Sequence, residues 1–281
     1  MPVPCSRQPS VMLQRELTFY CQQPLTIPQA QRLRRLGGMF QSRLLLLNLA
    51  RRQQANPEQP LAVLALGVCP GDLCQLVIEG CDAELAHMVL TSWVNEQGVL
   101  LGPSTDHDEA GRRLALHLPD YHFPPASQTL CNAADKQSCL RHLVGQLPDS
   151  RLRDPAQLMR HLLAREQVCA TVMRPGLAMP HVMSSSVLAP CISMVYSPTP
   201  LEWQSSLGPV QRVILLALPE HPHEEHLSPL SHLVRALLDD VLCPALLRAT
   251  TPAARRAILV EALIPAGTNH DIGTGSALSS A

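Results

Sequence analysis

The sequence predicts a mixed α and β protein in two parts, a small α+β unit followed by an α/β unit with a mixed sheet flanked by helices. Apolar strand-like runs and amphipathic helical stretches alternate along the chain, which is typical of layered folds of sheets and helices. A chain of 281 residues is long enough for one or two domains. A segment rich in turn residues separates the two halves.

The first part is expected to span residues 1–96. Its clearest strand is Leu73–Glu79, which follows the turn signal Pro70-Gly71-Asp72. Asp82 then caps a helix that continues through Val94, with apolar residues at helical spacing. The other expected elements are strands at 17–21 and 44–49, a helix at 28–40 and a short apolar helix or turn at 61–66.

Residues 97–127 are expected to form a linker, because glycines, Pro103 and a polar run interrupt the apolar pattern there. The second part is expected at residues 128–266. Its elements are helices at 135–145, 155–165, 230–238 and 252–263, and strands at 187–196 and 212–218. Residues 267–281 are rich in Gly, Ser and Thr and are expected to be disordered.

Composition excludes several classes of function. The net charge of -1 provides no basic field for nucleic acid. No apolar run approaches the ~18 residues of a membrane span, so any membrane contact is expected to be indirect. The ten cysteines are scattered without a CxxC pair, and the polar start of the chain has no secretory signal, so we expect reduced thiols in a cytoplasmic protein.

His181 is the first candidate for chemistry, because it directly follows Pro180. Proline locks its own φ and restricts the residue before it, so the imidazole is expected at a fixed strand or loop end. A neutral imidazole nitrogen is a good nucleophile near neutral pH, and its bond to phosphorus can pass a phosphoryl group onward. No bound cofactor is needed for such a transfer.

Phosphoryl transfer also needs positive electrostatics around the phosphoryl oxygens. His226 lies before an expected helix whose cap is Ser228 and whose first turn contains Pro229, and free N–H groups at such a helix start favour a phosphate. Arg165 ends the preceding helix, where it could equally serve the helix dipole. The HPHEEH run at 221–226 could instead bind a metal, but no second cluster of ligands is evident.

These residues form an ordered pattern, in which Arg165-Glu166 is followed by Ala178-Met179-Pro180-His181, two strands and His226-Leu227. The pattern resembles the enzyme IIA domain of the fructose–mannitol class of the bacterial phosphotransferase system. The resemblance implies that His181 is phosphorylated, that His226 binds the phosphate and that Arg165 lies near the site. It departs at Val182, where the family usually has a small residue.

In the first part, the stretch 23–27, Gly67, the Gly71-Asp72 turn and the 73–79 strand follow one another. This order resembles HPr, the small histidine phosphocarrier of the same system, and implies an open-faced β-sandwich. In that family the loop leads into His-Ala-Arg-Pro, whereas here residues 28–31 are Pro, Gln, Ala and Gln. Proline has no nitrogen that could accept a phosphoryl group. The resemblance therefore implies a degenerate carrier domain without its carrier histidine.

Together these resemblances imply a phosphoryl carrier that accepts from phospho-HPr, a separate protein, and donates to a IIB component for fructose-like sugar uptake. A second hypothesis is a regulatory binding protein in which phosphorylation of His181 changes the choice of partner. A third is a decaying paralogue that folds but has lost its activity. The intact Pro180-His181 and His226 argue against the third.

Overall fold

The computed structural model describes residues 13–102, 108–124 and 131–265, so the expected disordered tail lies outside the described residues. These residues form two compact units. The first comprises 13–102 together with 248–250, and the second comprises the rest up to residue 247 together with 251–265. Both units combine sheets with helices, which confirms the predicted mixed α and β class. No helix of the described residues is both long and apolar enough to cross a bilayer.

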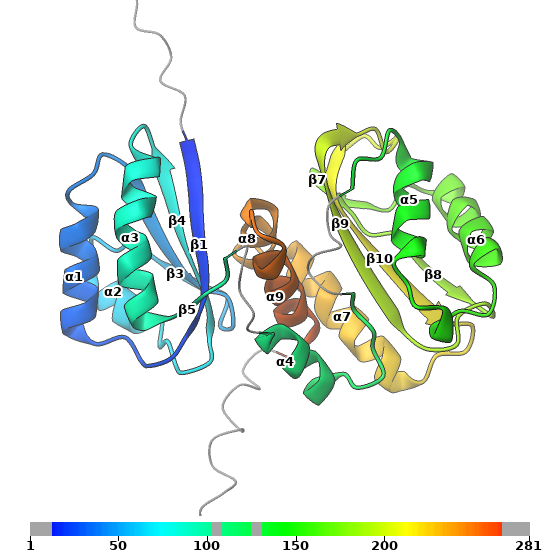
Figure 1. Ribbon diagram of the computed structural model, residues 1–281, viewed down its shortest axis with the longest axis horizontal. Coiled ribbons are helices and arrows are strands. Elements are labelled where there is room, and N and C mark those ends of the chain that lie inside the picture. The colour runs from blue at the N-terminus through cyan, green and yellow to red at the C-terminus, as the bar shows by residue number, and fades with distance from the viewer. Residues whose placement is uncertain (1–12, 103–107, 125–130, 266–281) are drawn as a thin grey trace, which may run out of the picture. The chain divides into compact units, whose positions relative to one another are not determined.

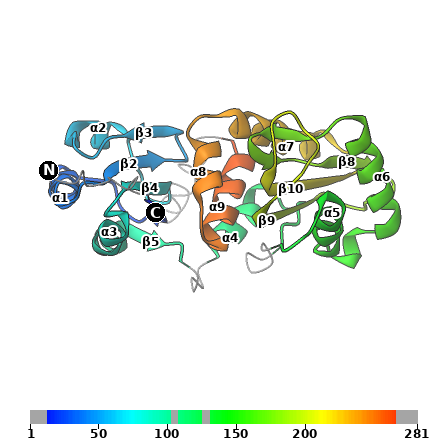
Figure 2. The same ribbon diagram turned by 90° about the horizontal axis from the view of Figure 1, so that it is seen from above.

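The first unit is built on an antiparallel sheet of five strands in the order β3-β2-β4-β1-β5. Its strands are β1 (Leu13–Cys21), β2 (Arg43–Asn48), β3 (Gln53–Ala55), β4 (Leu73–Gly80) and β5 (Gly98–Leu100). Its helices are α1 (Ile27–Gly37), α2 (Pro60–Ala65) and α3 (Ala83–Gln97). The helices cover one face of the sheet (Figures 1 and 2).

The core of this unit lies between the sheet and its helices. Side chains alternate between the two faces of a strand, so Leu17 and Phe19 of β1 point to the same face. Phe19 meets Trp93 of α3 edge to face with ring centroids 6.5 Å apart, and both side chains are fully buried. Leu33 of α1 and Leu90 of α3 complete this contact layer.

The segment expected as a linker, 97–127, differs from that expectation, because it contains regular structure. Gly98–Leu100 forms β5, in which Val99 pairs with Tyr20. Gly98 serves this pairing, since a Cβ there would lie 2.0 Å from the Tyr20 carbonyl oxygen. Helix α4 (Glu109–His117) follows, and its cap Asp108 accepts a hydrogen bond of 2.8 Å from the Gly111 amide.

The second unit has a mixed sheet. Strands β7 and β8 lie parallel to β10, while β9 pairs with β10 antiparallel and β6 pairs with β7. The strands are β6 (Val172–Arg174), β7 (Gly176–Ala178), β8 (His181–Ser184), β9 (Cys191–Leu201) and β10 (Val210–Pro219). The helices are α5 (Lys136–Gly145), η2 (Asp149–Arg151, a 3-10 turn), α6 (Pro155–Val168), α7 (Glu224–Leu238), α8 (Leu242–Arg248) and α9 (Pro252–Leu263).

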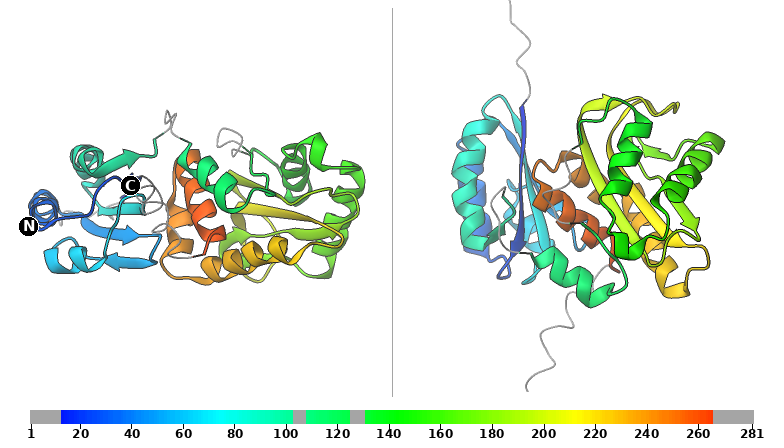
Figure 3. Two further views of the ribbon diagram at one scale, coloured as in Figure 1. Left: turned by 90° about the horizontal axis from the view of Figure 1, so that it is seen from below. Right: turned by 45° about the vertical axis from the view of Figure 1, so that its right-hand side comes forward.

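Helices cover both faces of this sheet. Helices α5 and α6 lie on one face, and α7 and α9 lie on the other (Figures 1 and 3). Alternate residues of β10, namely Val213, Leu215 and Ala217, belong to the core shared with α5 and α6. The intervening residues Ile214 and Leu216 are also fully or almost fully buried and therefore point to the α7–α9 face.

We expect the substitution Leu90→Ala to lower the free energy of unfolding of the first unit by about 2–5 kcal/mol, because it removes a fully buried side chain and leaves a cavity. Met88→Ala, on the same helix but at a side chain that is 66% exposed, is the matched control and should change it little. Urea unfolding followed by circular dichroism measures both. Equal effects of the two substitutions would contradict this packing.

Candidate functional site

His181 is the first residue of β8 and lies opposite Leu216 of β10. The two short strands β7 and β8 pair with successive parts of β10, and Met179-Pro180 forms the break between them. Pro180 has no N–H for the ladder, but its carbonyl accepts a hydrogen bond of 3.0 Å from the Leu216 amide. The histidine is therefore held by backbone pairing on both sides of the break, as the Pro-His step predicted.

One hydrogen bond fixes the tautomer of the His181 ring. Its Nδ1 lies 3.0 Å from the Met179 carbonyl oxygen. A carbonyl oxygen can only accept, so Nδ1 must carry the proton. In the neutral ring the lone pair then resides on Nε2, which makes Nε2 the nucleophilic nitrogen.

The alternation along β8 determines the face on which the His181 ring lies. Val182 packs against the core formed with α5 and α6, and the Ser184 hydroxyl lies 2.8 Å from His161 Nδ1 of α6. His181 and Met183 therefore point to the other face, the one covered by α7 and α9. His181 is half-buried and Met183 is 50% exposed, so the ring stands where another molecule can approach it.

His226 lies in the first turn of α7, the helix that follows β10 and covers the same face as His181. It is 8% exposed. Its Nε2 lies 3.4 Å from Asp120 Oδ2, and its carbonyl accepts a hydrogen bond from the Tyr121 hydroxyl. The His223 ring packs against it at 5.3 Å between centroids. The register and the connection thus place both candidate histidines toward the carboxyl end of β10, on one face of the sheet.

The expected start of this helix was wrong. Helix α7 begins at Glu224, so Ser228 is not its cap and Pro229 lies inside it. Glu224 and Glu225 occupy the first turn, where carboxylates interact favourably with the helix dipole. A shallow pocket lined by His223, Glu224, Glu225 and Ser228 lies here, and its two carboxylates repel an anion. The start of this helix is therefore acidic, and the His226 ring rather than the helix end is the candidate group on it.

Arg165 is placed differently from the two histidines. It lies in the last turn of α6, which packs on the opposite face of the sheet from His181. Its guanidinium donates a hydrogen bond of 3.0 Å to the Cys169 carbonyl just beyond the helix end. This is the helix-end role that the sequence left open. Its neighbour Glu166 is buried and accepts a hydrogen bond of 3.0 Å from Trp203 Nε1.

Sequence reasoning missed Asp120 and Tyr121, because they belong to the segment read as a linker. It also missed the hydrogen bond between His161 and Ser184 under β8. Nothing in the local sequence pattern of these residues distinguishes them from surface polar groups, since the contacts connect positions far apart in the chain. Only the fold brings Asp120 to His226, 106 residues further along.

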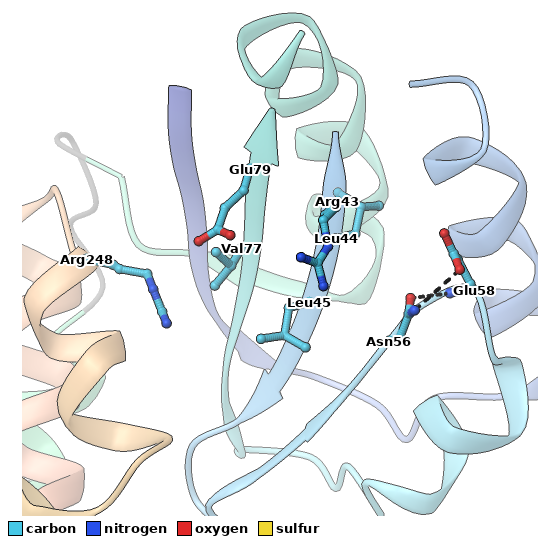
Figure 4. A pocket seen from close by; sticks show the side chains of 8 residues that line it. All are labelled: Arg43, Leu44, Leu45, Asn56, Glu58, Val77, Glu79 and Arg248. Carbon is cyan, nitrogen blue, oxygen red and sulfur yellow. Dashed lines mark hydrogen bonds between the residues drawn. The ribbon is translucent and has the colours of Figure 1, made fainter. Parts of the chain in front are cut away.

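Two other features of the molecule do not add to this site. Within residues 13–102, 108–124 and 131–265, no group of three His, Cys, Asp or Glu side chains is arranged to hold a metal ion, and this includes the HPHEEH run. A pocket of about 210 Å³ in the first unit includes Arg43, Asn56 and Glu79 in its lining (Figure 4). No histidine lines this pocket, so it offers no imidazole for phosphoryl transfer.

The fold and the candidate site can be compared with known families. Residues 126–262 match the family described as "Phosphoenolpyruvate-dependent sugar phosphotransferase system, EIIA 2". The C-terminal region of the chain is therefore similar to the EIIA domains of this system.

Individual relatives extend this similarity. A "Multiphosphoryl transfer protein" of Escherichia coli O157:H7 is 30% identical over 210 residues, which are 73% of this chain and 23% of that protein. The chain thus spans about a quarter of the length of this relative. A "Nitrogen regulatory protein" of Pseudomonas aeruginosa is 31% identical over 87 residues, 31% of this chain and 56% of that one. The solved structure of the nitrogen regulatory protein IIA-Ntr of Neisseria meningitidis aligns with 50% of this chain and 97% of its own, with 22% identity and a TM-score of 0.44.

Proposed function

We propose that this protein is a phosphoryl carrier of the phosphoenolpyruvate-dependent sugar phosphotransferase system, with residues 128–266 as its carrier domain and His181 as the acceptor. The observation that carries the proposal is the hydrogen bond from His181 Nδ1 to the Met179 carbonyl, which leaves Nε2 with its lone pair on an accessible face. The EIIA family match supports the same assignment.

The reaction is a reversible exchange of one nitrogen–phosphorus bond for another. Nε2 of His181 attacks the phosphorus of phospho-HPr, the N–P bond of the donor breaks, and its electron pair returns to the donor imidazole. The Nδ1 nitrogen of His181 keeps its proton throughout and donates a hydrogen bond to the Met179 carbonyl oxygen. In the second step a nucleophile of a IIB component attacks the same phosphorus, the bond from phosphorus to His181 Nε2 breaks, and its electron pair returns to Nε2. The assignment to fructose-like sugars rests on the sequence resemblance, since the domain contacts proteins rather than sugar.

His226 is the proposed phosphate-stabilising residue. It lies on the face to which His181 points, and Asp120 accepts from its Nε2. Arg165 is proposed as a further cation near the site. Strand β8 pairs only with β10 among the described strands and therefore forms an edge of the sheet. A long side chain on α6, such as that of Arg165, can extend past this edge toward the face on which His181 lies.

The first unit, proposed as an HPr-like domain in residues 1–96, does not carry phosphate in this scheme. At the expected carrier loop, Thr26 caps α1 and the Gln29 side chain accepts hydrogen bonds of 2.7 and 2.8 Å from the Thr26 amide and hydroxyl. Pro28 occupies the first turn of the helix. The residues that replace the carrier motif thus serve helix capping, and His87 on α3 is the one histidine of this part.

A regulatory role is the second candidate. The absence of an acceptor at Pro28 and Gln29 favours a docking or regulatory function for the first unit, and one relative is named a nitrogen regulatory protein. In that case phosphorylation of His181 would change partner choice by adding charge to an exposed surface. Phosphorylated protein that transfers no label to any IIB component would favour this reading.

We expect wild-type protein to take acid-labile phosphoryl label from radiolabelled phosphoenolpyruvate through enzyme I and HPr, and His181→Ala to take none. His87→Ala is the matched control and should be labelled like the wild type, because the first unit carries no acceptor. Label that maps to residues 1–96 would contradict the proposal for the first unit. An unlabelled wild type that is folded by circular dichroism would contradict the carrier function.

The nitrogen that carries the phosphoryl group is a separate prediction. Because Nδ1 is committed to the Met179 carbonyl, we expect phosphorylation of His181 at Nε2. Nitrogen-15 spectra of the phosphorylated ring, with coupling to phosphorus, distinguish the two isomers. A phosphoryl group found on Nδ1 would show that this hydrogen bond does not control the reaction.

Arg165→Ala should lower the rate of phosphoryl acceptance by roughly tenfold if the guanidinium reaches the phosphoryl oxygens, since a charge-assisted hydrogen bond contributes about 1.5–3 kcal/mol. Arg160→Ala, on the same helix and with a side chain 70% exposed, is the matched control and should leave the rate unchanged. Single-turnover labelling measures both rates. Equal rates for the two variants would show that Arg165 does not act on the phosphoryl group and serves only in its hydrogen bond to the Cys169 carbonyl.

A further inference from the structure

A short segment that precedes the matched EIIA region contacts the candidate site. Asp120 and Tyr121 lie outside residues 126–262, yet both contact His226. The Asp120 carboxylate lies 3.4 Å from His226 Nε2, and the Tyr121 hydroxyl donates to the His226 carbonyl. The two rings of Tyr121 and His226 also meet edge to face at 6.5 Å. The segment therefore contacts both the backbone and the side chain of this histidine.

The segment is held rigidly from its other side. The Arg151 guanidinium donates to the Asp120 carbonyl, and the Tyr121 amide donates to the Leu118 carbonyl at 3.0 Å. His122 forms a parallel bridge to the start of β9, with its amide donating to Pro190 at 3.1 Å and its carbonyl accepting from Ile192 at 2.8 Å. These backbone bonds fix the position of Asp120 relative to the sheet, so its carboxylate is a placed group although its side chain is 63% exposed.

The chemistry of this contact defines the state of the His226 ring. An ionised carboxylate can only accept, so His226 Nε2 must carry a proton toward Asp120. The other nitrogen, Nδ1, is buried and has no hydrogen-bond partner among the described residues. In a neutral ring that nitrogen would bear only a lone pair and could not donate to a phosphoryl oxygen. It becomes a donor only in the imidazolium, in which both nitrogens carry protons.

Three groups among the described residues face the His226 ring, namely Asp120, Tyr121 and His223. Burial raises the pKa of Tyr121 to about 12, so its hydroxyl stays neutral. Asp120 is the acidic group among them, and its carboxylate accepts from Nε2. The contact therefore fixes which nitrogen of the neutral ring carries the proton.

We propose that Asp120 is a positioning residue for phosphoryl transfer, which fixes the tautomer and the orientation of the His226 ring through its contact with Nε2. This inference rests on the proposed function of His181. It assigns a role in the reaction to a segment that the EIIA family match does not include. Asp120 acts through His226 and does not itself touch the transferred group.

The test uses the full chain and four proteins: wild type, Asp120→Asn, Asp120→Glu and Asp149→Asn. Asp149 is an exposed aspartate of the same unit, in the 3-10 turn, and is the matched control. Single-turnover labelling from phospho-HPr gives the rate. We expect Asp120→Asn to lower this rate by about tenfold or more, Asp120→Glu to restore much of it, and Asp149→Asn to match the wild type.

Nitrogen-15 spectra of the His226 ring provide a second measurement. They would not change if Asp120 contributed only to the stability of the fold. In the wild type we expect the proton of the neutral ring on Nε2, and in Asp120→Asn, where a neutral amide replaces the carboxylate, we expect a weaker preference for this tautomer. Suppose that the wild type is labelled and that Asp120→Asn has the same rate and the same ring spectrum as Asp149→Asn. This result would overturn the inference about Asp120 and leave the proposed function standing. A folded wild type that takes no label overturns the proposed function and this inference together.

Discussion

The second unit depends on strand β10, which is paired along both of its edges. It pairs with β9 on one side and, on the other, with β7 and then β8. Its residues are buried on both faces of the sheet, as expected of a central strand covered by helices on each side. Because the ladder to β8 fixes His181 opposite Leu216, and because α7 follows directly from the end of β10, this one strand positions both candidate histidines.

The proposed acceptor, His181, is oriented by the backbone rather than by another side chain. The break at Met179-Pro180 exposes a carbonyl that no strand partner uses, and the imidazole two residues later binds it. Backbone carbonyls cannot be protonated or removed by substitution, so this arrangement fixes one tautomer independently of the surrounding side chains. The half-buried ring keeps its nucleophilic nitrogen toward a face that a protein partner can reach. Such pre-orientation would suit the proposed carrier function.

The first unit is held together by interactions that need no reacting group. Its core is formed by apolar side chains between sheet and helices, with Phe19 and Trp93 at the centre. The loop before α1 contributes a capping box through Thr26 and Gln29, which stabilises the helix start. None of these interactions requires a histidine. The stability of this unit therefore depends on apolar packing and helix capping.

Local pattern in the sequence predicted the long elements and the acceptor candidate. Periods of two and of about 3.6 residues identified β4, α3, α6, β10 and α9, and the Pro180-His181 step identified a fixed imidazole. The short strands β3, β5, β6, β7 and β8 were not predicted, because segments of three or four residues carry too little period and exist through their pairing. Helix α4 has nine residues and was missed because it lies in the stretch that was read as a linker.

The start of α7 was placed too late in the sequence because of Pro229. Proline is common in the first turn of a helix, and here it lies inside the helix. The tertiary structure alone decided which face His181 and His226 share and which carbonyl the Arg165 guanidinium binds. It also decided that Asp120 meets His226, because contacts between residues 106 positions apart leave no trace in local pattern. Residue types and their spacing determined the available chemistry, and strand register and packing determined which of those groups stand together.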